Sequence, residues 1–168
     1  MRLAVTGTPG TGKTTATDLV ESPLGVVHLN ELVREESLYT SVDETRDSLI
    51  ADIDAIEERL ADREDVIVES HLSHRLSVDA VVVLRCAPAM LADRLRERGA
   101  DEKKASENAE SEALDVILSE AVERHGTENV YEIDTTDRSP EAVASRIEAV
   151  VRGDREPSAG EVDFTEYV

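Results

Sequence analysis

Tryptophan is absent from this sequence, and the 168 residues include only one phenylalanine and three tyrosines. The single cysteine, Cys86, excludes an internal disulfide and a zinc site built from a cysteine cluster. Because Cys86 follows an apolar run, we expect a buried structural thiol rather than a redox or catalytic one. No hydrophobic run approaches the length of a membrane span, which predicts one soluble domain with a sizeable core and no membrane partner. The N-terminus lacks the features of a signal peptide, so we expect a cytoplasmic protein.

Positive charge is also scarce. The chain has 38 acidic and 18 basic residues, and its formal net charge is −20. A surface this acidic repels nucleic acid at low salt, so we expect no strong direct binding of nucleic acid. Only three basic residues are lysines, and short Ala and Val side chains are abundant, a pattern that indicates a halophilic protein working in molar salt. There a Debye length of about 3 Å would screen much of the repulsion. An ordinary acidic protein is the alternative.

A glycine-rich stretch near the N-terminus carries the most specific motif. The segment from Gly7 to Thr14 fits G-x-x-x-x-G-K-[ST], between an apolar run at 3–5 and a helix-compatible segment at 15–20. Its glycines let backbone N–H groups turn inward on an anion. We expect Lys13 to reach the β and γ phosphates of a nucleotide and the Thr14 hydroxyl to hold Mg²⁺. A plain glycine-rich turn is the alternative, but the pattern seldom arises by chance.

A second candidate region follows the apolar run at 66–68, where Glu69, Ser70 and His71 come in succession. Ligands of an open parallel sheet bind outside the carboxyl ends of its strands. Glu69 and His71 would therefore lie beside the glycine-rich loop if this strand neighbours the first. A carboxylate there can hold Mg²⁺ through water or orient an attacking hydroxyl. The alternative is a polar strand end without a function.

Basic residues gather at Arg94, Arg96 and Arg98, with Lys103 and Lys104 close behind. Arg94 and Arg98 are four residues apart, so on a helix both could converge on transferring phosphates. Salt bridges to nearby glutamates are the alternative.

A long polar helix is predicted from Asp101 onward, with an apolar stripe only in its second half, at Leu114, Ile117, Leu118 and Ala121. An exposed first half that follows arginines and a glycine suits a lid that closes over nucleotide.

Short apolar runs predict five strands, at 3–5, 26–29, 66–68, 78–84 and 130–133. Helices are predicted between them: a turn capped by Asn30, a helix capped within 41–43 with an apolar stripe at Leu49, Ile53, Ile56 and Leu60, a helix begun by Pro88, and a final helix capped by Ser139. This alternation predicts an α/β fold, a three-layer sandwich around a five-stranded parallel sheet. Residues 1–152 would form this domain, and 153–168 an acidic, mobile tail.

Four motifs, in order along the chain, resemble the adenylate-kinase isoenzyme 6 family, and the resemblance covers residues 1–152. The motifs are G-T-P-G-T-G-K-T-T (7–15), V-R-E-E-S-L-Y (33–39), V-I-V-E-S-H (66–71) and R-L-R-E-R-G-A-D-E-K-K-A-S-E-N (94–108). The family consists of small nucleoside-monophosphate kinases of the P-loop NTPase fold with a short lid. They also hydrolyse ATP and act in maturation of the small ribosomal subunit and its rRNA.

The resemblance assigns roles to individual residues. It implies ATP binding by Gly10, Gly12, Lys13, Thr14, Thr15 and Arg98, with Arg138 in an adenine-side loop. It further implies a monophosphate-binding segment at 28–51, where Arg34 would clamp the acceptor phosphate, and a lid at 97–107. The implied partner is the eleventh small-subunit ribosomal protein on the pre-ribosomal small subunit.

The sequence departs from the family at the Asp-x-His motif, which is Glu69-Ser70-His71 here, and at Ala100, which replaces a lid aromatic. The segment from 71 to 81 is also short. Three hypotheses therefore stand: reversible transfer between ATP and AMP or another monophosphate, with Mg²⁺; an assembly factor driven by ATP hydrolysis; and a P-loop kinase for another small metabolite.

Overall fold

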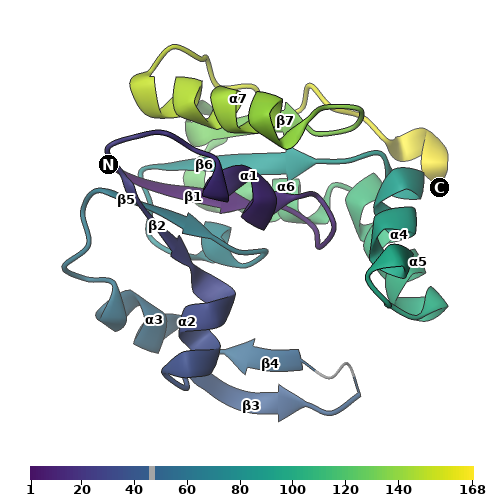
Figure 1. Ribbon diagram of the computed structural model, residues 1–168, viewed down its shortest axis with the longest axis horizontal. Coiled ribbons are helices and arrows are strands. Elements are labelled where there is room, and N and C mark those ends of the chain that lie inside the picture. The colour runs from purple at the N-terminus through teal and green to yellow at the C-terminus, as the bar shows by residue number, and fades with distance from the viewer. Residues whose placement is uncertain (46–47) are drawn as a thin grey trace.

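Five parallel strands form the central sheet in the order β2-β5-β1-β6-β7 (Figure 1). The computed structural model describes residues 1–45 and 48–168. The strands are β1 (Arg2–Thr6), β2 (Gly25–His28), β5 (Val66–Glu69), β6 (Ala80–Arg85) and β7 (Val130–Asp134). The central strands are buried on both faces, which is why they read as nearly continuous apolar runs. The predicted five-stranded parallel sheet is confirmed.

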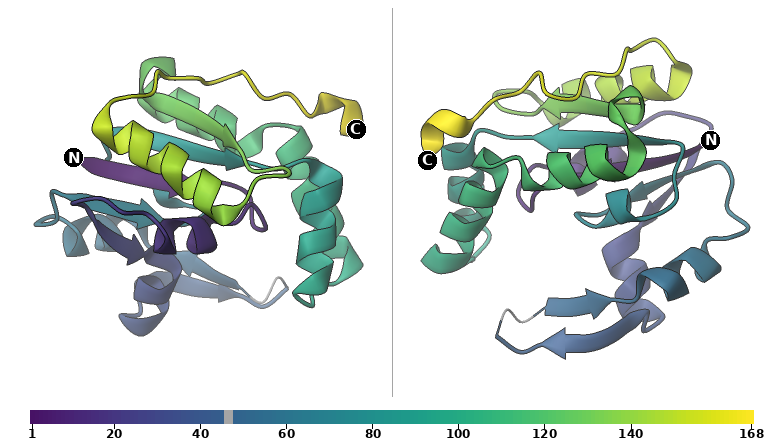
Figure 2. Two further views of the ribbon diagram at one scale, coloured as in Figure 1. Left: turned by 45° about the horizontal axis from the view of Figure 1, so that its top comes forward. Right: turned by 180° about the vertical axis from the view of Figure 1, so that it is seen from behind.

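Helices cover both faces of the sheet (Figures 1 and 2). Leu3 packs in one cluster with α1 (Lys13–Asp18) and α7 (Pro140–Arg152), whereas its neighbour Ala4 packs in another with α6 (Val116–His125). This alternation follows from the two-residue period of a strand. Val68, which pairs with Ala4, packs in a third cluster with α2 (Leu29–Glu35) and α3 (Ile53–Arg59). The three-layer sandwich is therefore confirmed.

A β-hairpin stands where the sequence predicted the start of an amphipathic helix. Strands β3 (Tyr39–Asp43) and β4 (Ser48–Ala51) pair antiparallel. Both belong to the predicted monophosphate-binding segment, 28–51, of which residues 46–47 lie outside the described part of the chain. The prediction was wrong because Leu49 packs in the same cluster as Ile56, although it lies on a strand. The cap of α3 is Asp52, whose side chain accepts a hydrogen bond from the Ala55 amide at 3.1 Å.

The predicted long helix from Asp101 is two helices, α5 (Glu102–Ala113) and α6, because Asp115 adopts a left-handed backbone conformation between them. The stripe predicted in the second half is confirmed at Leu118 and Ala121, which are buried, but Leu114 is 53% exposed, and the first half is not exposed throughout because Ala105 and Ala109 are fully buried. These alanines pack on Leu91 and the rest of α4 (Pro88–Glu97). Alanine is too small to mark an apolar stripe, although it lets two helices approach closely.

Of the remaining predictions, those for the start of the final helix and for the cysteine agree with the structure, and the one for Asn30 does not. Ser139 caps α7 through its side chain, and Pro140 is the first helical residue, as predicted. Cys86 is fully buried, and burial raises the pKa of its thiol, which agrees with a structural role. The prediction for Asn30 was wrong, because α2 already begins at Leu29. Asn30 instead accepts a hydrogen bond from the Ser70 hydroxyl at 2.9 Å.

The segment 153–168, expected to be a mobile tail, runs along β7 to a short 3₁₀ turn (Thr165–Tyr167). The Ser158 amide donates to the Val130 carbonyl at 3.0 Å. The buried Glu132 carboxylate accepts hydrogen bonds from the amides of Glu161 and Val162 at 2.8 and 3.2 Å. The tail thus has defined contacts with the domain.

Candidate active site

The glycine-rich loop connects β1 to α1 over the end of β6. Gly7 has φ 150°, and a Cβ built on it would lie 2.6 Å from the carbonyl oxygen of Leu84. A Cβ on Gly10, at φ 97°, would lie 3.2 Å from Leu95 of α4. These glycines are therefore required by close approach and by backbone conformation together. The loop has the strand-loop-helix context that its motif predicts.

Lys13 lies inside this loop, 8% exposed. Its Nζ donates to the carbonyl oxygens of Gly7 at 2.9 Å and Thr8 at 3.2 Å. Within the described residues no carboxylate pairs with it directly, and burial lowers its pKa to about 8 against the opposing effect of Glu69. A phosphate in the loop would supply the missing negative charge and hold the ammonium protonated.

Glu69 ends β5 beside β1, where it pairs in register with Val5 and is only 4% exposed. Its Oε2 lies 3.4 Å from the Thr14 hydroxyl. A hydroxyl and a carboxylate suit Mg²⁺, which keeps several waters and takes its other ligands from phosphates. Among the described residues no group of three or more His, Cys, Asp or Glu side chains is arranged to hold a metal alone. A cation at Thr14 and Glu69 would therefore depend on the phosphates of a bound nucleotide.

His28 joins this site although the sequence analysis missed it. Its Nδ1 lies 2.8 Å from Glu69 Oε2, and its Nε2 lies 2.8 Å from Asp18 Oδ1. Partial burial opposes protonation of the ring, but the hydrogen bonds to Glu69 and Asp18 outweigh it and raise the His28 pKa. One signal was available: His28 ends its strand as Glu69 does, and the two are partners in the sheet register.

His71 is half-buried near the loop. Burial, with a smaller contribution from the Lys13 charge, lowers its pKa to about 4. The ring is therefore neutral at pH 7 and can donate or accept a hydrogen bond, but it adds no positive charge to the site.

The arginines of α4 have three different environments. Arg94 donates to the Gly10 carbonyl at 3.2 Å, so it supports the loop from outside. Arg96 pairs with Asp93 at 2.8 Å and Glu102 at 2.7 Å, which is the salt-bridge alternative. Arg98, exposed at the end of the helix, lies close enough to Lys13 to depress its pKa.

Arg98 shares one property with Arg34, which is exposed in the last turn of α2: within residues 1–45 and 48–168 neither side chain makes a hydrogen bond or ion pair. In a chain of net charge −20, two unpaired guanidinium groups are available to bind anions. Of the remaining predicted residues, Thr15 is exposed after the loop, and Arg138 donates to the main-chain carbonyl of Asp134.

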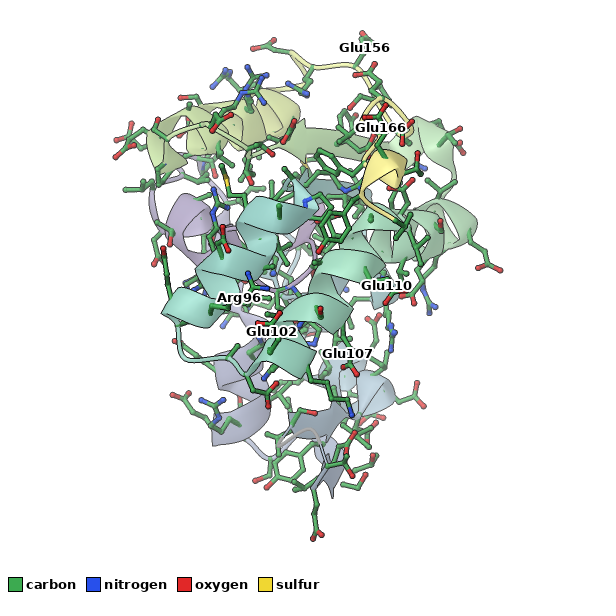
Figure 3. All side chains as sticks on the ribbon, turned by 90° about the vertical axis from the view of Figure 1, so that its right-hand side faces the viewer. Arg96, Glu102, Glu107, Glu110, Glu156 and Glu166 are labelled. Atoms are coloured by element: carbon green, nitrogen blue, oxygen red, sulfur yellow. The ribbon has the colours of Figure 1, made fainter. Side chains whose placement is uncertain are left out.

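The predicted lid, 97–107, comprises the turn between α4 and α5 and the first turns of α5, at the end of α4 that lies away from the sheet (Figure 1). Figure 3 shows Arg96 and Glu102 at this turn, and Glu156 and Glu166 of the tail on the same side of the molecule.

None of the helices in the described part of the chain has the length and apolar character of a membrane span.

Comparison with known proteins agrees with this geometry. The family model described as an AAA domain matches residues 3–115. A Halobacterium salinarum protein named "Putative adenylate kinase" is 65% identical over the full length of both chains. Proteins of the same name from Natronomonas pharaonis and Methanocaldococcus jannaschii are 62% identical over 100% of both chains, and 40% identical over 99% of this chain and 94% of the relative.

Two solved structures share the fold at 15% sequence identity. Shikimate kinase from Bacteroides thetaiotaomicron matches with a TM-score of 0.54 over 90% of this chain and 98% of that chain. Deoxyadenosine kinase from M. mycoides matches with a TM-score of 0.57 over 91% of this chain and all of that chain. The sheet, the loop and these relatives lead to one conclusion: the chain belongs to the AAA-domain family of P-loop proteins and, within it, to the group of archaeal relatives that carry the adenylate kinase name.

Proposed function

We propose that this protein is a nucleoside-monophosphate kinase that converts ATP and AMP into two ADP. The observation that carries the proposal is a set of cations without counter-charges: Lys13, buried in the loop, and the side chains of Arg34 and Arg98, which lie unpaired at the ends of two different helices. Phosphoryl transfer needs little covalent chemistry from a protein, because positioning and charge neutralisation supply most of the catalysis. The archaeal relatives named for adenylate kinase support the choice of acceptor.

Each cation would serve one part of the reaction. Lys13 would bind the β and γ phosphates of ATP, and Arg98 would contact the same phosphates from the lid. Arg34 would hold the acceptor phosphate, with Arg138 on the adenine side and Arg94 keeping the loop in shape. Thr14 and Glu69 would hold Mg²⁺, which neutralises phosphate charge when bound. His71, neutral at pH 7, would provide a hydrogen bond near the transferring group.

A coupled assay across nucleoside monophosphates, shikimate and deoxyadenosine tests the proposal, with Lys13→Ala as the control. We propose a halophilic, cytoplasmic protein, so the assay belongs in molar KCl. ADP formation that depends on AMP and disappears in the variant is the expected result. ADP formation only with shikimate or a nucleoside would overturn the monophosphate assignment, and activity in Lys13→Ala would overturn the site.

A second candidate function is an ATPase that releases a basic partner, which the resemblance identifies as the eleventh small-subunit ribosomal protein. The acidic side formed by α5 and the tail, including Glu110, Glu156 and Glu166, favours such a partner (Figure 3). In molar salt, charge attraction is screened beyond about 3 Å, so lasting affinity needs close contacts. A pull-down of the recombinant pair in molar KCl should show binding that ATP with Mg²⁺ weakens. Absence of binding would leave only the kinase, and indifference to nucleotide would remove the switch.

A further inference from the structure

We infer that His28 is a positioning residue that fixes the Glu69 carboxylate for the Mg²⁺-dependent part of nucleotide binding. This inference rests on the proposed function, because it assigns a role within the same site. The side-chain hydrogen bonds of His28 go to Glu69 and Asp18, so His28 acts on the site through Glu69.

Each ring nitrogen of His28 lies against a carboxylate oxygen. Nδ1 lies 2.8 Å from Glu69 Oε2, and Nε2 lies 2.8 Å from Asp18 Oδ1, so that a protonated ring donates to both carboxylates. Since both ring nitrogens face carboxylates, the ring can neither flip nor rotate without losing a hydrogen bond. Asp18 ends α1, the helix that Lys13 and Thr14 begin, so the ring connects Glu69 to the far end of the loop's own helix.

The hydrogen bond from His28 gives the two carboxylate oxygens of Glu69 different surroundings. Oε2 is occupied by His28 and lies near Thr14, at 3.4 Å. The other oxygen, Oε1, accepts no hydrogen bond from any residue in the described ranges 1–45 and 48–168. It is therefore left for a water of a cation's hydration shell. Groups that orient a metal-holding carboxylate usually matter for affinity almost as much as the carboxylate itself.

The imidazole of His28 also connects α2, which carries the proposed AMP-binding Arg34, to the end of β5, which carries Glu69. His28 is the residue immediately before α2, which carries Arg34. Two residues further on, Asn30 accepts a hydrogen bond from Ser70 at 2.9 Å, next to Glu69. The start of α2 is thus attached to the end of β5 by two side-chain bonds. A purely structural surface pair would contribute little to stability and nothing to the Mg²⁺ dependence of ATP binding.

Two isosteric variants separate these roles. The amide nitrogen of Asn can take the place of imidazole Nδ1, so His28→Asn keeps the bond to Glu69 and loses the bond to Asp18. The amide nitrogen of Gln reaches the place of Nε2, so His28→Gln keeps Asp18 and loses Glu69. Both variants lose one of the two bonds and remain polar, which makes each the matched control of the other.

The measurement is ATP binding by titration calorimetry in molar KCl, with MgCl₂ and with EDTA, together with the thermal midpoint of each free protein. His28→Gln should lose about tenfold in ATP affinity with MgCl₂ and stay within about twofold of the wild type in EDTA. His28→Asn should stay close to the wild type in both.

Equal affinities in the two variants, or a loss that is the same in EDTA, would overturn the positioning role. Wild-type ATP binding that ignores MgCl₂ would overturn it too, while nucleotide binding by the loop would stand. A wild-type protein that binds no ATP would contradict the proposed function itself, so the two failures are distinguishable.

Discussion

Two buried cations lie within this small domain, and their surroundings are opposite. Lys13 of the loop has only the carbonyl oxygens of Gly7 and Thr8 as hydrogen-bond partners, and burial lowers its pKa to about 8. Arg85, at the end of β6, is 1% exposed. Burial alone would lower its pKa, but the carboxylates around it, Glu112 first, raise the value above that of a free arginine.

The partners of Arg85 come from α5 and the residues just after it, from β7 and from the tail. Glu112 of α5 and Glu132 of β7 each lie 2.6 Å from the guanidinium, and Asp115 binds a third nitrogen. The ring of Phe164 in the tail lies 5.5 Å away. Arg85 is therefore saturated by the protein and has no capacity for a ligand, whereas Lys13 still lacks an anion. The comparison shows that a buried cation indicates a binding site only when its counter-charge is missing.

The strongest test of this contrast is Arg85→Leu, which removes the cation and leaves the buried carboxylates of Glu112 and Glu132 without a positive counter-charge. We expect the free energy of unfolding to fall by about 3–5 kcal/mol, as when one partner of a buried ion pair is removed. Urea denaturation in molar KCl measures it. Arg152→Ala, which breaks an exposed pair with Asp154, is the control and should change stability by less than about 1 kcal/mol. Similar losses for both variants would mean that burial does not distinguish the two arginines.

Lys13→Ala should lose activity and keep its stability, whereas Arg85→Leu should lose stability. Both AMP phosphorylation and ATP hydrolysis should fall at least about a hundredfold, because the group that neutralises the transferring phosphates is gone. The thermal midpoint should not fall, since the deleted ammonium has no buried carboxylate that its removal would leave unpaired. Wild-type turnover by the folded variant would show that the loop is not the catalytic site.

The unpaired surface arginines sharpen the comparison further. Arg34→Ala should raise the KM for AMP about tenfold and leave ATP affinity nearly unchanged, while Arg98→Ala should slow both kinase and ATPase reactions. Steady-state kinetics combined with ATP titration separates the two outcomes. Arg96→Ala, which removes an arginine already paired with Asp93 and Glu102, is the matched control and should leave both activities unchanged. Equal loss of ATP affinity in Arg34→Ala and Arg98→Ala would contradict the division into acceptor and donor sides.

The smallest effect is a pH dependence of ATP affinity. Phosphate should hold the Lys13 ammonium protonated, so the Lys13 pKa is higher in the complex than its value of about 8 in the free protein. Below pH 8 the group is charged in both states and affinity is constant. Above pH 8 binding takes up a proton, and affinity should fall about fivefold between pH 8 and 9.

The check for this dependence is titration of ATP binding against pH, compared with Lys13→Arg. The guanidinium of that variant does not titrate in this range, so its affinity, although weaker, should be flat. A slope shared by both proteins would assign the pH dependence to another group.

The sequence predicted the elements that have a local signature. The loop motif requires glycines at fixed positions, and the apolar runs at 3–5, 66–68 and 130–133 became strands because nothing else buries such short segments. The partner of Glu69 was not predictable in the same way. His28 comes 41 residues earlier and meets Glu69 only through the sheet register.

The errors have a common physical origin in tertiary contacts. Leu49 satisfied a helical period, yet it packs from a hairpin strand on the same cluster as α3. The break at Asp115 has no glycine or proline to mark it, and its carboxylate binds Arg85 from a strand thirty residues earlier. Arg85 was not singled out in the sequence, because its three carboxylate partners lie 27 to 47 residues away along the chain.

The hydrogen bonds of Glu132 also set an order of events during synthesis. One oxygen of this buried carboxylate contacts Arg85, and the other accepts hydrogen bonds from the amides of Glu161 and Val162, which are translated after β7 and α7. The strand β7 can join the sheet earlier, but its buried acid keeps unmet hydrogen-bond capacity until those amides arrive. Completion of the fold therefore waits until Glu161 and Val162 have been made, and a nascent chain interrupted near Gly153 would present Glu132 to solvent.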